Sequence, residues 1–266
     1  MVINMGKRPR IAVALGAGSA RGLAHIGVLQ VLLENQIQVD LITGSSMGAM
    51  VGCVYAGGAD IYMLDKMVQH MNTKLLFDIC VPRKGFVAGN RVMDFLDLIT
   101  KKKSFADLQV PVAVVTTDLA TGSRVVIEEG PVSEAVRASI SIPGIFEPVI
   151  KGDMVLVDGA VCDRLPIDVA WERGADLVIA VDVTFGSGQK PPLNTTMDII
   201  LTSLDIMAKH QFDCVAARAD ILIQPAVGHI NPKDFDRSRE IVDLGREATE
   251  VRIREIKDKI KSFTAG

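Results

Sequence analysis

Short apolar runs, glycine-rich turns and helical patterns alternate along most of the chain. The run Ile11–Leu15 predicts a buried parallel strand, and a helical spacing of apolar residues follows from Leu23 to Asn35. Val39–Thr43 predicts a second strand, and Gly44–Tyr55 predicts a turn that opens another helix. This order of strand, turn and helix is typical of the α/β class.

The alternation continues to the C-terminal end. Helical patterns cover residues 60–107 with a break at 82–89, and then residues 131–139, 165–173 and 197–218. Strand patterns cover residues 110–117, 124–127, 153–157, 176–183 and 219–224, with the first two expected to pair in antiparallel fashion. Residues 186–195, rich in glycine and proline, predict a loop.

The last pattern predicts one terminal helix. Asn231 is expected to cap it, with Pro232 at its first position, and its apolar face is Ile241, Leu244, Ala248 and Val251. No change of composition divides the chain. We therefore predict a tail over residues 1–8 and a single domain over residues 9–266.

Composition and charge narrow the choice of function. The chain has 266 residues, 48% of them hydrophobic, and its 29 basic and 32 acidic side chains leave a net charge of −3. This balance argues against a nucleic-acid partner. The four cysteines lie far apart and form no zinc-binding pattern, so we expect reduced thiols, no metal and a cytoplasmic location. The N-terminus lacks an apolar segment followed by a cleavage site.

One uncharged stretch requires a test against membrane insertion. The 19 residues of Leu41–Ala59 carry no charge, and Gly44, Gly48 and Gly52 form two overlapping GxxxG patterns. The stretch is short, contains five glycines and begins as a strand, so we expect it not to span a membrane.

A candidate nucleophile lies at the start of this stretch. Gly44, Ser45, Ser46, Met47 and Gly48 fit the GxSxG pattern between a strand and a helix. Such a turn lifts its central serine out of the sheet, and the helix behind it directs its N-terminal dipole toward developing negative charge. Ser46 is then the nucleophile and Ser45 a bystander. A helix-packing turn of small residues is the structural alternative.

The glycine-rich segment Gly16–Gly22 admits three interpretations. It is a tight turn, a dinucleotide phosphate site, or an oxyanion hole presented to Ser46. The dinucleotide interpretation requires an acid at the end of the next strand, whereas Asp40 begins that strand.

The catalytic base is harder to assign. Asp158 follows a predicted strand and precedes Gly159, so it is either a base at the sheet edge or a turn-forming residue. The order Ser46, Asp158, His229 also matches the chain order of an α/β-hydrolase triad. His25 and His229 both have ordinary structural interpretations.

Two other features have weak functional interpretations. Met63, Met67 and Met71 lie at helical spacing and form either a core stripe or the wall of an acyl-chain channel. The run Lys101–Lys103 is either a solvated turn or a contact for anionic lipid.

Five motifs, in order over residues 9–250, resemble the patatin-like phospholipases, in particular the compact single-domain prokaryotic branch. The segment Leu15–Leu29 resembles the oxyanion segment of that family, and Gly44–Gly48 resembles its nucleophile elbow. The other three matching stretches are Val157-Asp-Gly-Ala160, the proline-bearing block over residues 138–149, and residues 224–237.

The resemblance implies a three-layer α/β/α fold with a mostly parallel central sheet. It further implies a Ser46–Asp158 dyad without a catalytic histidine, an oxyanion hole at Gly18 and Ser19, and a loop oriented by Arg21. Gly44 and Gly48 flank the elbow, and Gly159 and Ala160 complete the aspartate motif. Partial desolvation is expected to strengthen Asp158 as a base. No metal or cofactor is implied.

The implied activity is hydrolysis of an acyl ester through an acyl-enzyme. The substrate is a phospholipid, a lysophospholipid or another acyl ester, and peripheral contact with a membrane is compatible with it. Acyl transfer by the same acyl-enzyme and a non-catalytic lipid-binding role are the alternatives. Three residues depart from the family pattern, since Ala17 and Ser19 stand where glycine is common and Arg164 where asparagine is common. The sequence leaves the oligomeric state open.

Overall fold

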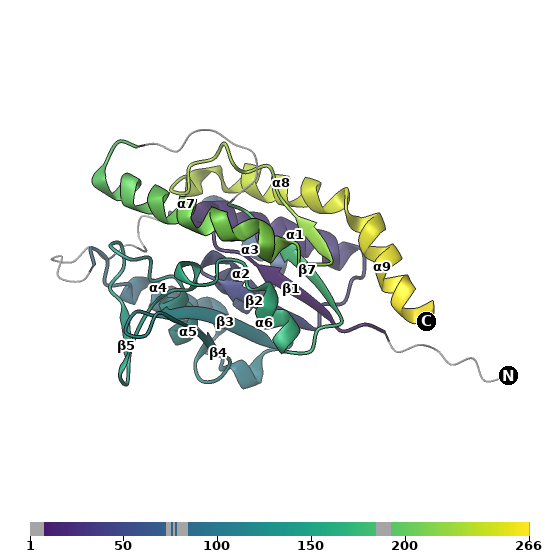
Figure 1. Cartoon of the computed structure of the whole chain (residues 1–266), viewed down its shortest axis with the longest axis horizontal. Coiled ribbons are helices and arrows are strands. Elements are labelled where there is room, and N and C mark those ends of the chain that lie inside the picture. Colours follow the sequence, from purple (N-terminus) through teal and green to yellow (C-terminus); the bar gives the residue numbers. More distant parts are fainter. Residues whose placement is uncertain (1–7, 73–75, 77, 79–84, 185–192, 266) are drawn as a thin grey trace.

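A sheet of eight strands forms the centre of the part of the molecule that the structure describes (Figure 1). This computed structural model describes residues 8–72, 76, 78, 85–184 and 193–265. The strand order is β5-β6-β3-β2-β1-β7-β8, with β4 paired to β3. The strands are β1 (Ile11–Leu15), β2 (Leu41–Ser45), β3 (Val112–Asp118), β4 (Ser123–Ile127), β5 (Val149–Lys151), β6 (Met154–Asp158), β7 (Leu177–Val181) and β8 (Ile221–Ile223).

The middle of the sheet is parallel and buried on both faces. Strands β1, β2, β3, β7 and β8 pair in parallel, whereas β4, β5 and β6 pair in antiparallel fashion. Ile11, Val13 and Leu15 belong to one apolar cluster, while Ala12 and Ala14 between them belong to another. Because a strand covered on both faces requires apolar side chains in both directions, these strands read as continuous apolar runs.

Helices cover both faces of the sheet, which gives three layers (Figure 1). Helices α6 and α7 pack on one face through Trp171, Phe212 and Val215. The other helices pack with the larger cluster on the opposite face. The helices are α1 (Ala24–Glu34), α2 (Met47–Ala56), α3 (Ile61–His70), α4 (Asn90–Thr100), α5 (Val132–Ser139), α6 (Ile167–Glu172), α7 (Thr196–Ala216), α8 (Ser238–Glu250) and α9 (Ile253–Ala265), with short 3-10 turns η1 (Ser19–Leu23), η3 (Phe105–Asp107), η4 (Gly159–Val161) and η5 (Phe235–Arg237). The predicted three-layer α/β/α fold is confirmed.

Two strands share one edge of β3, and their register brings two distant segments together. Ser45, the last residue of β2, pairs with Val115, and Asp158, the last residue of β6, pairs with Thr116. Since β4 occupies the opposite edge along residues 114–118, β2 and β6 must lie end to end on this edge. The carboxyl ends of β2 and β6 therefore meet, which places the residue after Ser45 beside Asp158.

The C-terminal prediction was partly wrong. Pro232 does not open a helix, because a 3-10 turn follows it and α8 begins at Ser238. The terminal segment forms two helices rather than one, and Val251 lies at their junction with 79% of its surface exposed. Ile241 is buried as expected. The strand β5 was not predicted, and most of the loop predicted at 186–195 lies outside the described residues.

The uncharged stretch Leu41–Ala59 is an element of the core. It forms β2 and α2, and its glycines let α2 approach β1 and β2 closely. A Cβ on Gly52, for example, would lie 2.7 Å from the Ile42 side chain. Within the described part of the chain, every helix is too short or too polar to cross a membrane.

Candidate active site

Ser46 lies at a sharp turn between β2 and α2. Its backbone has φ 55° and ψ −122°, a conformation that residues with a Cβ rarely adopt. Neighbouring glycines make room for the turn, since a Cβ on Gly44 would lie 2.6 Å from the Ala49 backbone and one on Gly48 would lie 2.1 Å from the Leu15 carbonyl oxygen. The strand and helix therefore present Ser46 as the GxSxG pattern predicts.

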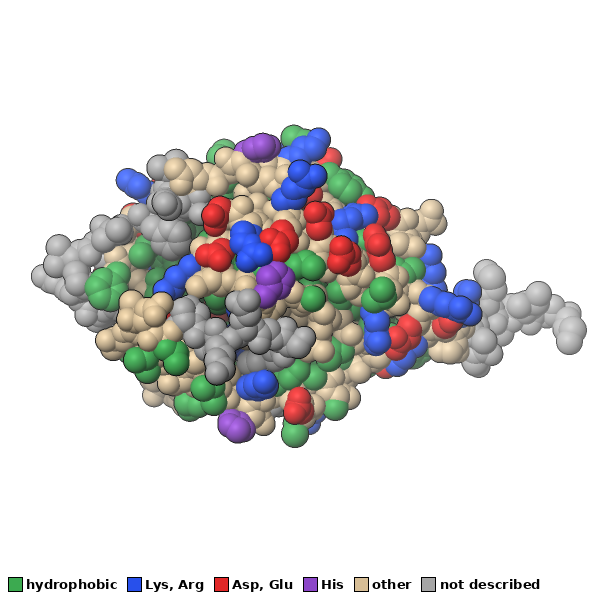
Figure 2. Space-filling model, turned by 90° about the horizontal axis from the view of Figure 1, so that it is seen from above, with side chains coloured by type: hydrophobic (Ala, Val, Ile, Leu, Met, Phe, Trp, Pro, Cys, Tyr) green, Lys and Arg blue, Asp and Glu red, His purple; other side chains and the backbone are tan. Residues whose placement is uncertain are grey.

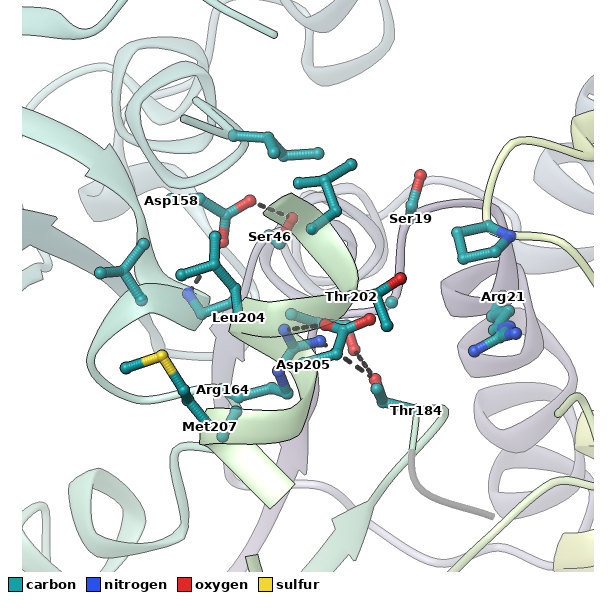
Figure 3. Close-up of a pocket in the computed structure, with 18 of the residues that line it drawn as sticks. Ser19, Arg21, Ser46, Asp158, Arg164, Thr184, Thr202, Leu204, Asp205 and Met207 are labelled. Carbon is teal, nitrogen blue, oxygen red and sulfur yellow. Dashed lines mark hydrogen bonds and ion pairs between the residues drawn. The ribbon is translucent and has the colours of Figure 1, made fainter. Parts of the chain in front are cut away.

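Ser46 and Asp158 are in direct contact. The Ser46 hydroxyl donates a hydrogen bond of 2.6 Å to Oδ2 of Asp158 (Figure 3). The other carboxylate oxygen, Oδ1, accepts a hydrogen bond of 2.8 Å from the backbone N–H of Ala160. One carboxylate oxygen of Asp158 thus accepts a hydrogen bond from the serine, and the other is held by the turn that Gly159 and Ala160 form. A Cβ on Gly159 would lie 2.3 Å from the Val115 carbonyl oxygen, so only glycine fits there.

The environment of Asp158 makes it a stronger base than an ordinary carboxylate. Its side chain is buried. This burial raises the pKa of Asp158 to about 6, while the hydrogen bonds from Ser46 and Ala160 oppose the rise. The carboxylate is still ionised at neutral pH, and it is able to take a proton from the hydroxyl that it contacts.

Sequence reasoning missed a set of residues that hold the two partners in place. The Ser139 hydroxyl accepts a hydrogen bond of 2.8 Å from the Ser46 backbone N–H and donates one of 2.7 Å to the Val115 carbonyl. The Ser141 carbonyl accepts a hydrogen bond of 3.0 Å from the Asp158 N–H. Only the resemblance of the proline-bearing block at 138–149 indicated that this segment was special.

Arg137 fixes the segment that carries these serines. It is buried, and its guanidinium donates to the Ser141 hydroxyl and to the carbonyls of Ala88 and Glu147. Burial lowers the pKa of Arg137 from its ordinary value. Arg137 and Ser141 thereby connect the Asp158 backbone to the loop before α4.

The glycine-rich loop presents unused backbone donors to the same cavity. Within the described part of the chain, the N–H groups of Gly18 and Ser19 have no acceptor, and both residues line the cavity that contains Ser46. Gly18 has an extended φ of 178°. Ser19, which stands where glycine is common in the family, has a φ of 50°, and its backbone is therefore in the left-handed region that residues with a Cβ rarely adopt. A Cβ on Gly18 would lie 2.4 Å from the Val183 side chain.

Arg21 lies apart from Ser46 in the cavity wall and ties this loop to a segment distant in the sequence (Figure 3). Its Nε donates a hydrogen bond of 2.7 Å to the Ile230 carbonyl, and a terminal nitrogen donates one of 3.1 Å to the Gly228 carbonyl. Burial lowers the pKa of Arg21 from its ordinary value.

Neither candidate histidine reaches Ser46. His229 is outside the cavity, and its ring nitrogens contact the Ala226 carbonyl and the Glu240 carboxylate at 3.0 Å each. His25 is buried and its Nε2 lies 2.7 Å from the Gly16 carbonyl oxygen. Burial lowers the pKa of His25 to about 4, so it is neutral at physiological pH and packs beneath the glycine-rich loop. Neither histidine is therefore placed to complete a Ser46–Asp158–His triad.

A cavity of about 400 Å³ surrounds the Ser46–Asp158 pair. Its walls come from the glycine-rich loop, the segment after β6, helix α7 and residues 231–233. Much of the wall is apolar, through Ile142, Ile145, Val161, Leu165, Leu201, Leu204, Met207, Phe212 and Val215. The methionine stripe at Met63, Met67 and Met71 takes no part in it, and Met63 is exposed.

Helix α7 crosses the cavity and is held by two ion pairs (Figure 3). Asp205 of α7 accepts from Arg164 at 2.6 Å, and Asp198 near its N-terminus pairs with Lys233 at 2.8 Å. Arg164 lies in the cavity wall and also contacts the Thr184 hydroxyl at 3.4 Å. The sequence pattern predicted this helix but not that it covers the site.

Comparison with known proteins identifies the family. The family described as patatin-like phospholipase matches residues 13–171, more than half of the chain. An uncharacterized NTE family protein of Mycobacterium tuberculosis is 36% identical over 216 residues, which cover 79% of this chain and 60% of that protein. Patatin-like phospholipase domain-containing protein 7 of Rattus norvegicus is 27% identical, over 88% of this chain and 20% of that protein. The chain belongs to the patatin-like phospholipase family, and it spans about three fifths of the length of the mycobacterial relative.

Solved structures share the fold. VipD from Legionella pneumophila superimposes with a TM-score of 0.67 at 14% identity, over 93% of this chain and 67% of its own. The type III effector protein ExoU gives a TM-score of 0.52 at 11% identity, over 94% of this chain and 54% of its own. At such low identity, these similarities concern the arrangement of the elements.

Proposed function

We propose that this protein hydrolyses the acyl esters of lipids, with Ser46 as the nucleophile and Asp158 as the base. The observation that carries the proposal is the 2.6 Å hydrogen bond from the Ser46 hydroxyl to a buried carboxylate, inside a cavity with apolar walls. A serine next to a base is the arrangement that nucleophilic catalysis requires. The apolar walls suit an acyl chain, and membership of the patatin-like phospholipase family supports a lipid substrate.

The first half of the proposed reaction uses these contacts. The Ser46 oxygen attacks the ester carbonyl carbon while its proton moves to Oδ2 of Asp158. The N–H groups of Gly18 and Ser19, together with the N-terminus of α2, stabilise the resulting oxyanion. The tetrahedral intermediate then collapses, Asp158 returns the proton to the leaving alcohol, and the acyl group remains on Ser46.

The second half repeats these roles with water. Asp158 takes a proton from a water molecule as that water attacks the acyl-enzyme carbonyl. Collapse of the second tetrahedral intermediate releases the fatty acid, and the Ser46 oxygen recovers its proton from Asp158. No histidine takes part in this scheme.

Two adjacent serines provide a matched test of the nucleophile. Ser46→Ala is expected to lower kcat about 1,000-fold or more on a soluble ester and on phospholipid. The control is Ser45→Ala, because the Ser45 hydroxyl is buried without a hydrogen-bond partner among the described residues, so its loss removes no hydrogen bond of the site. A fluorophosphonate adduct on the Ser46 peptide would support the assignment, and a fully active Ser46→Ala protein would refute it.

Substitution of His229 separates the dyad from a triad. His229→Ala removes a half-exposed ring that pairs with Glu240, so activity on both substrates is expected to be retained. Loss of activity in a His229→Ala protein that keeps the wild-type unfolding temperature would instead favour a triad.

A further inference from the structure

The outward side of α7 carries the densest group of exposed apolar side chains in the described part of the chain. Ile199, Ile200, Ile206 and Met207, here called the α7 apolar face, lie within nine residues and are between 47% and 66% exposed. Among the other described residues, Tyr62 and Met63 are the only exposed large apolar side chains that are adjacent in the sequence. Single exposed apolar residues are ordinary on protein surfaces, whereas a group on one helix face indicates a contact surface.

The charges of this part of α7 are directed to the body of the protein. Asp198 and Asp205 face the cavity wall, and Lys233 and Arg164 neutralise them. Between positions 199 and 207, the outward residue besides the apolar face is Ser203, which is uncharged. The outward side of this stretch therefore carries no charge besides that of Asp205, whose side chain is 42% exposed and paired with Arg164.

The α7 apolar face is continuous with the cavity that contains Ser46. Met207 belongs to the apolar face and also lines the cavity, so it marks a rim between the two. Val161 is likewise both exposed and part of the cavity wall. Leu204, on the inner side of α7, continues the apolar lining toward Ser46 and Asp158 (Figure 3).

We propose that the α7 apolar face rests on the lipid surface that contains the substrate. The proposal rests on the function proposed above, since acyl-ester lipids reside in bilayers and micelles. A helix that lies in a lipid surface buries its apolar side among the acyl chains and keeps its polar side toward the protein. The inner side of α7 lines the cavity. The lipid surface would therefore lie one helix diameter, about 10 Å, from the cavity that contains Ser46.

The position of the face on the molecule agrees with this orientation. Figure 2 views the molecule from above, and hydrophobic side chains gather along its lower left border, the side on which α7 lies in Figure 1. The side formed by α8 instead presents interspersed charges of both signs. An acyl chain that leaves the lipid surface at Met207 meets apolar side chains along its path to Ser46.

A vesicle-binding measurement tests the proposal directly. Partition into phosphatidylcholine vesicles, with and without phosphatidylglycerol, is measured on protein carrying Ser46→Ala, which keeps the vesicles intact. Adding Ile199→Asn with Ile206→Asn is expected to weaken partition into both vesicle types about tenfold or more. The matched control is Leu98→Asn with Val251→Asn, two exposed apolar residues away from the cavity, and it is expected to leave partition unchanged.

Activity separates this proposal from the proposed function. In protein that retains Ser46, Ile199→Asn with Ile206→Asn is expected to leave turnover of a soluble short-chain ester unchanged and to lower turnover of vesicle phospholipid about tenfold. Equal partition of the variant and the parent protein would overturn the surface proposal. So would a change from dimer to monomer with unchanged partition, which would assign the face to a second copy. Wild-type protein that hydrolyses neither substrate would refute the proposed function, while the vesicle measurement would still decide the surface.

Discussion

At the residue scale, the proposed chemistry depends on the burial of one carboxylate. In water an aspartate has a pKa near 3.9 and is a weak base. Burial raises the pKa of Asp158 to about 6, so its affinity for a proton increases while it stays ionised at neutral pH. The hydrogen bond from the Ser46 hydroxyl to Asp158 then allows the proton to move directly from the serine to the carboxylate. A carboxylate placed in this way has the properties that a general base requires.

This pKa predicts the pH dependence of activity. Asp158 acts as a base only when ionised, so kcat/KM on a soluble ester is expected to be half-maximal near pH 6 and to reach a plateau above it. At pH 5 the activity is expected to be about tenfold below the plateau. A profile that stays flat down to pH 4 in folded protein would contradict the role of Asp158.

The same burial predicts that removing the charge stabilises the protein. Asp158→Asn keeps the shape and the bond from Ala160, so at pH 8 the free energy of unfolding is expected to rise by about 1–3 kcal/mol while esterase activity is lost. Because the folded-state pKa is raised, the contribution of Asp158 to the stability of the wild type falls as pH rises from about 4 through about 6. Denaturant unfolding of the wild type and Asp158→Asn at pH 8 and pH 4 checks this prediction. An equal difference in the free energy of unfolding between the two proteins at both pH values would contradict it.

At the element scale, the site is an assembly of turns held by side chains from elsewhere in the chain. The elbow at Ser46 is held by Ser139, and the glycine-rich loop is held by Arg21. Arg21 makes two hydrogen bonds, to the carbonyls of Ile230 and Gly228, which tie the loop to residues 228–230. We therefore assign Arg21 a positioning role for the proposed oxyanion hole.

Arg21→Lys tests that role. A lysine keeps the charge but cannot reproduce the fork that reaches both carbonyls, so kcat on a soluble ester is expected to fall about tenfold with little change in KM. Arg8→Lys is the control, since Arg8 is outside the cavity and pairs with Asp40. A parallel loss of kcat in both variants, or a change in KM alone, would argue against the positioning role.

At the scale of the whole molecule, two glycines allow α1 and α8 to pack closely in the layer opposite α7. A Cβ on Gly27 of α1 would lie 2.1 Å from the Val242 carbonyl oxygen, and a Cβ on Gly245 of α8 would lie 2.1 Å from the Ala24 carbonyl oxygen. The two helices thus meet backbone to backbone at reciprocal positions. This contact fixes α8 and, through residues 228–233, the segment that Arg21 and Asp198 of α7 contact.

Gly27→Ala is therefore expected to separate α1 from α8. The added methyl group has no space, so the free energy of unfolding is expected to fall by about 2 kcal/mol or more. Leu33→Ala at an exposed position of the same helix is the control, with an expected change below about 1 kcal/mol. Denaturant unfolding of both proteins provides the comparison, and equal midpoints would show that the helices repack freely.

Local sequence patterns predicted the fold class and Ser46 as the candidate nucleophile. Continuous apolar runs predict strands buried on both faces, and glycines around Ser46 predict a sharp turn, because these signals are local. Asp158 and the segment Gly16–Gly22 were candidates with open alternatives, and the resemblance implied the roles of Asp158, Gly18, Ser19 and Arg21. Local patterns failed where the same residues suit two structures. Pro232 suits both a turn and the first position of a helix, and it precedes a 3-10 turn instead of opening α8.

Only the tertiary structure decided which distant residues meet. Ser46 and Asp158 are in contact because β2 and β6 share one edge of β3, and no local pattern records that register. The same holds for the Ser139 bond to the elbow and for the position of α7 over the cavity. Periodicity showed that α7 is a helix, but which of its sides is covered depends on packing between layers. That packing excludes His229 from the site and leaves Ile199 and Ile206 facing outward.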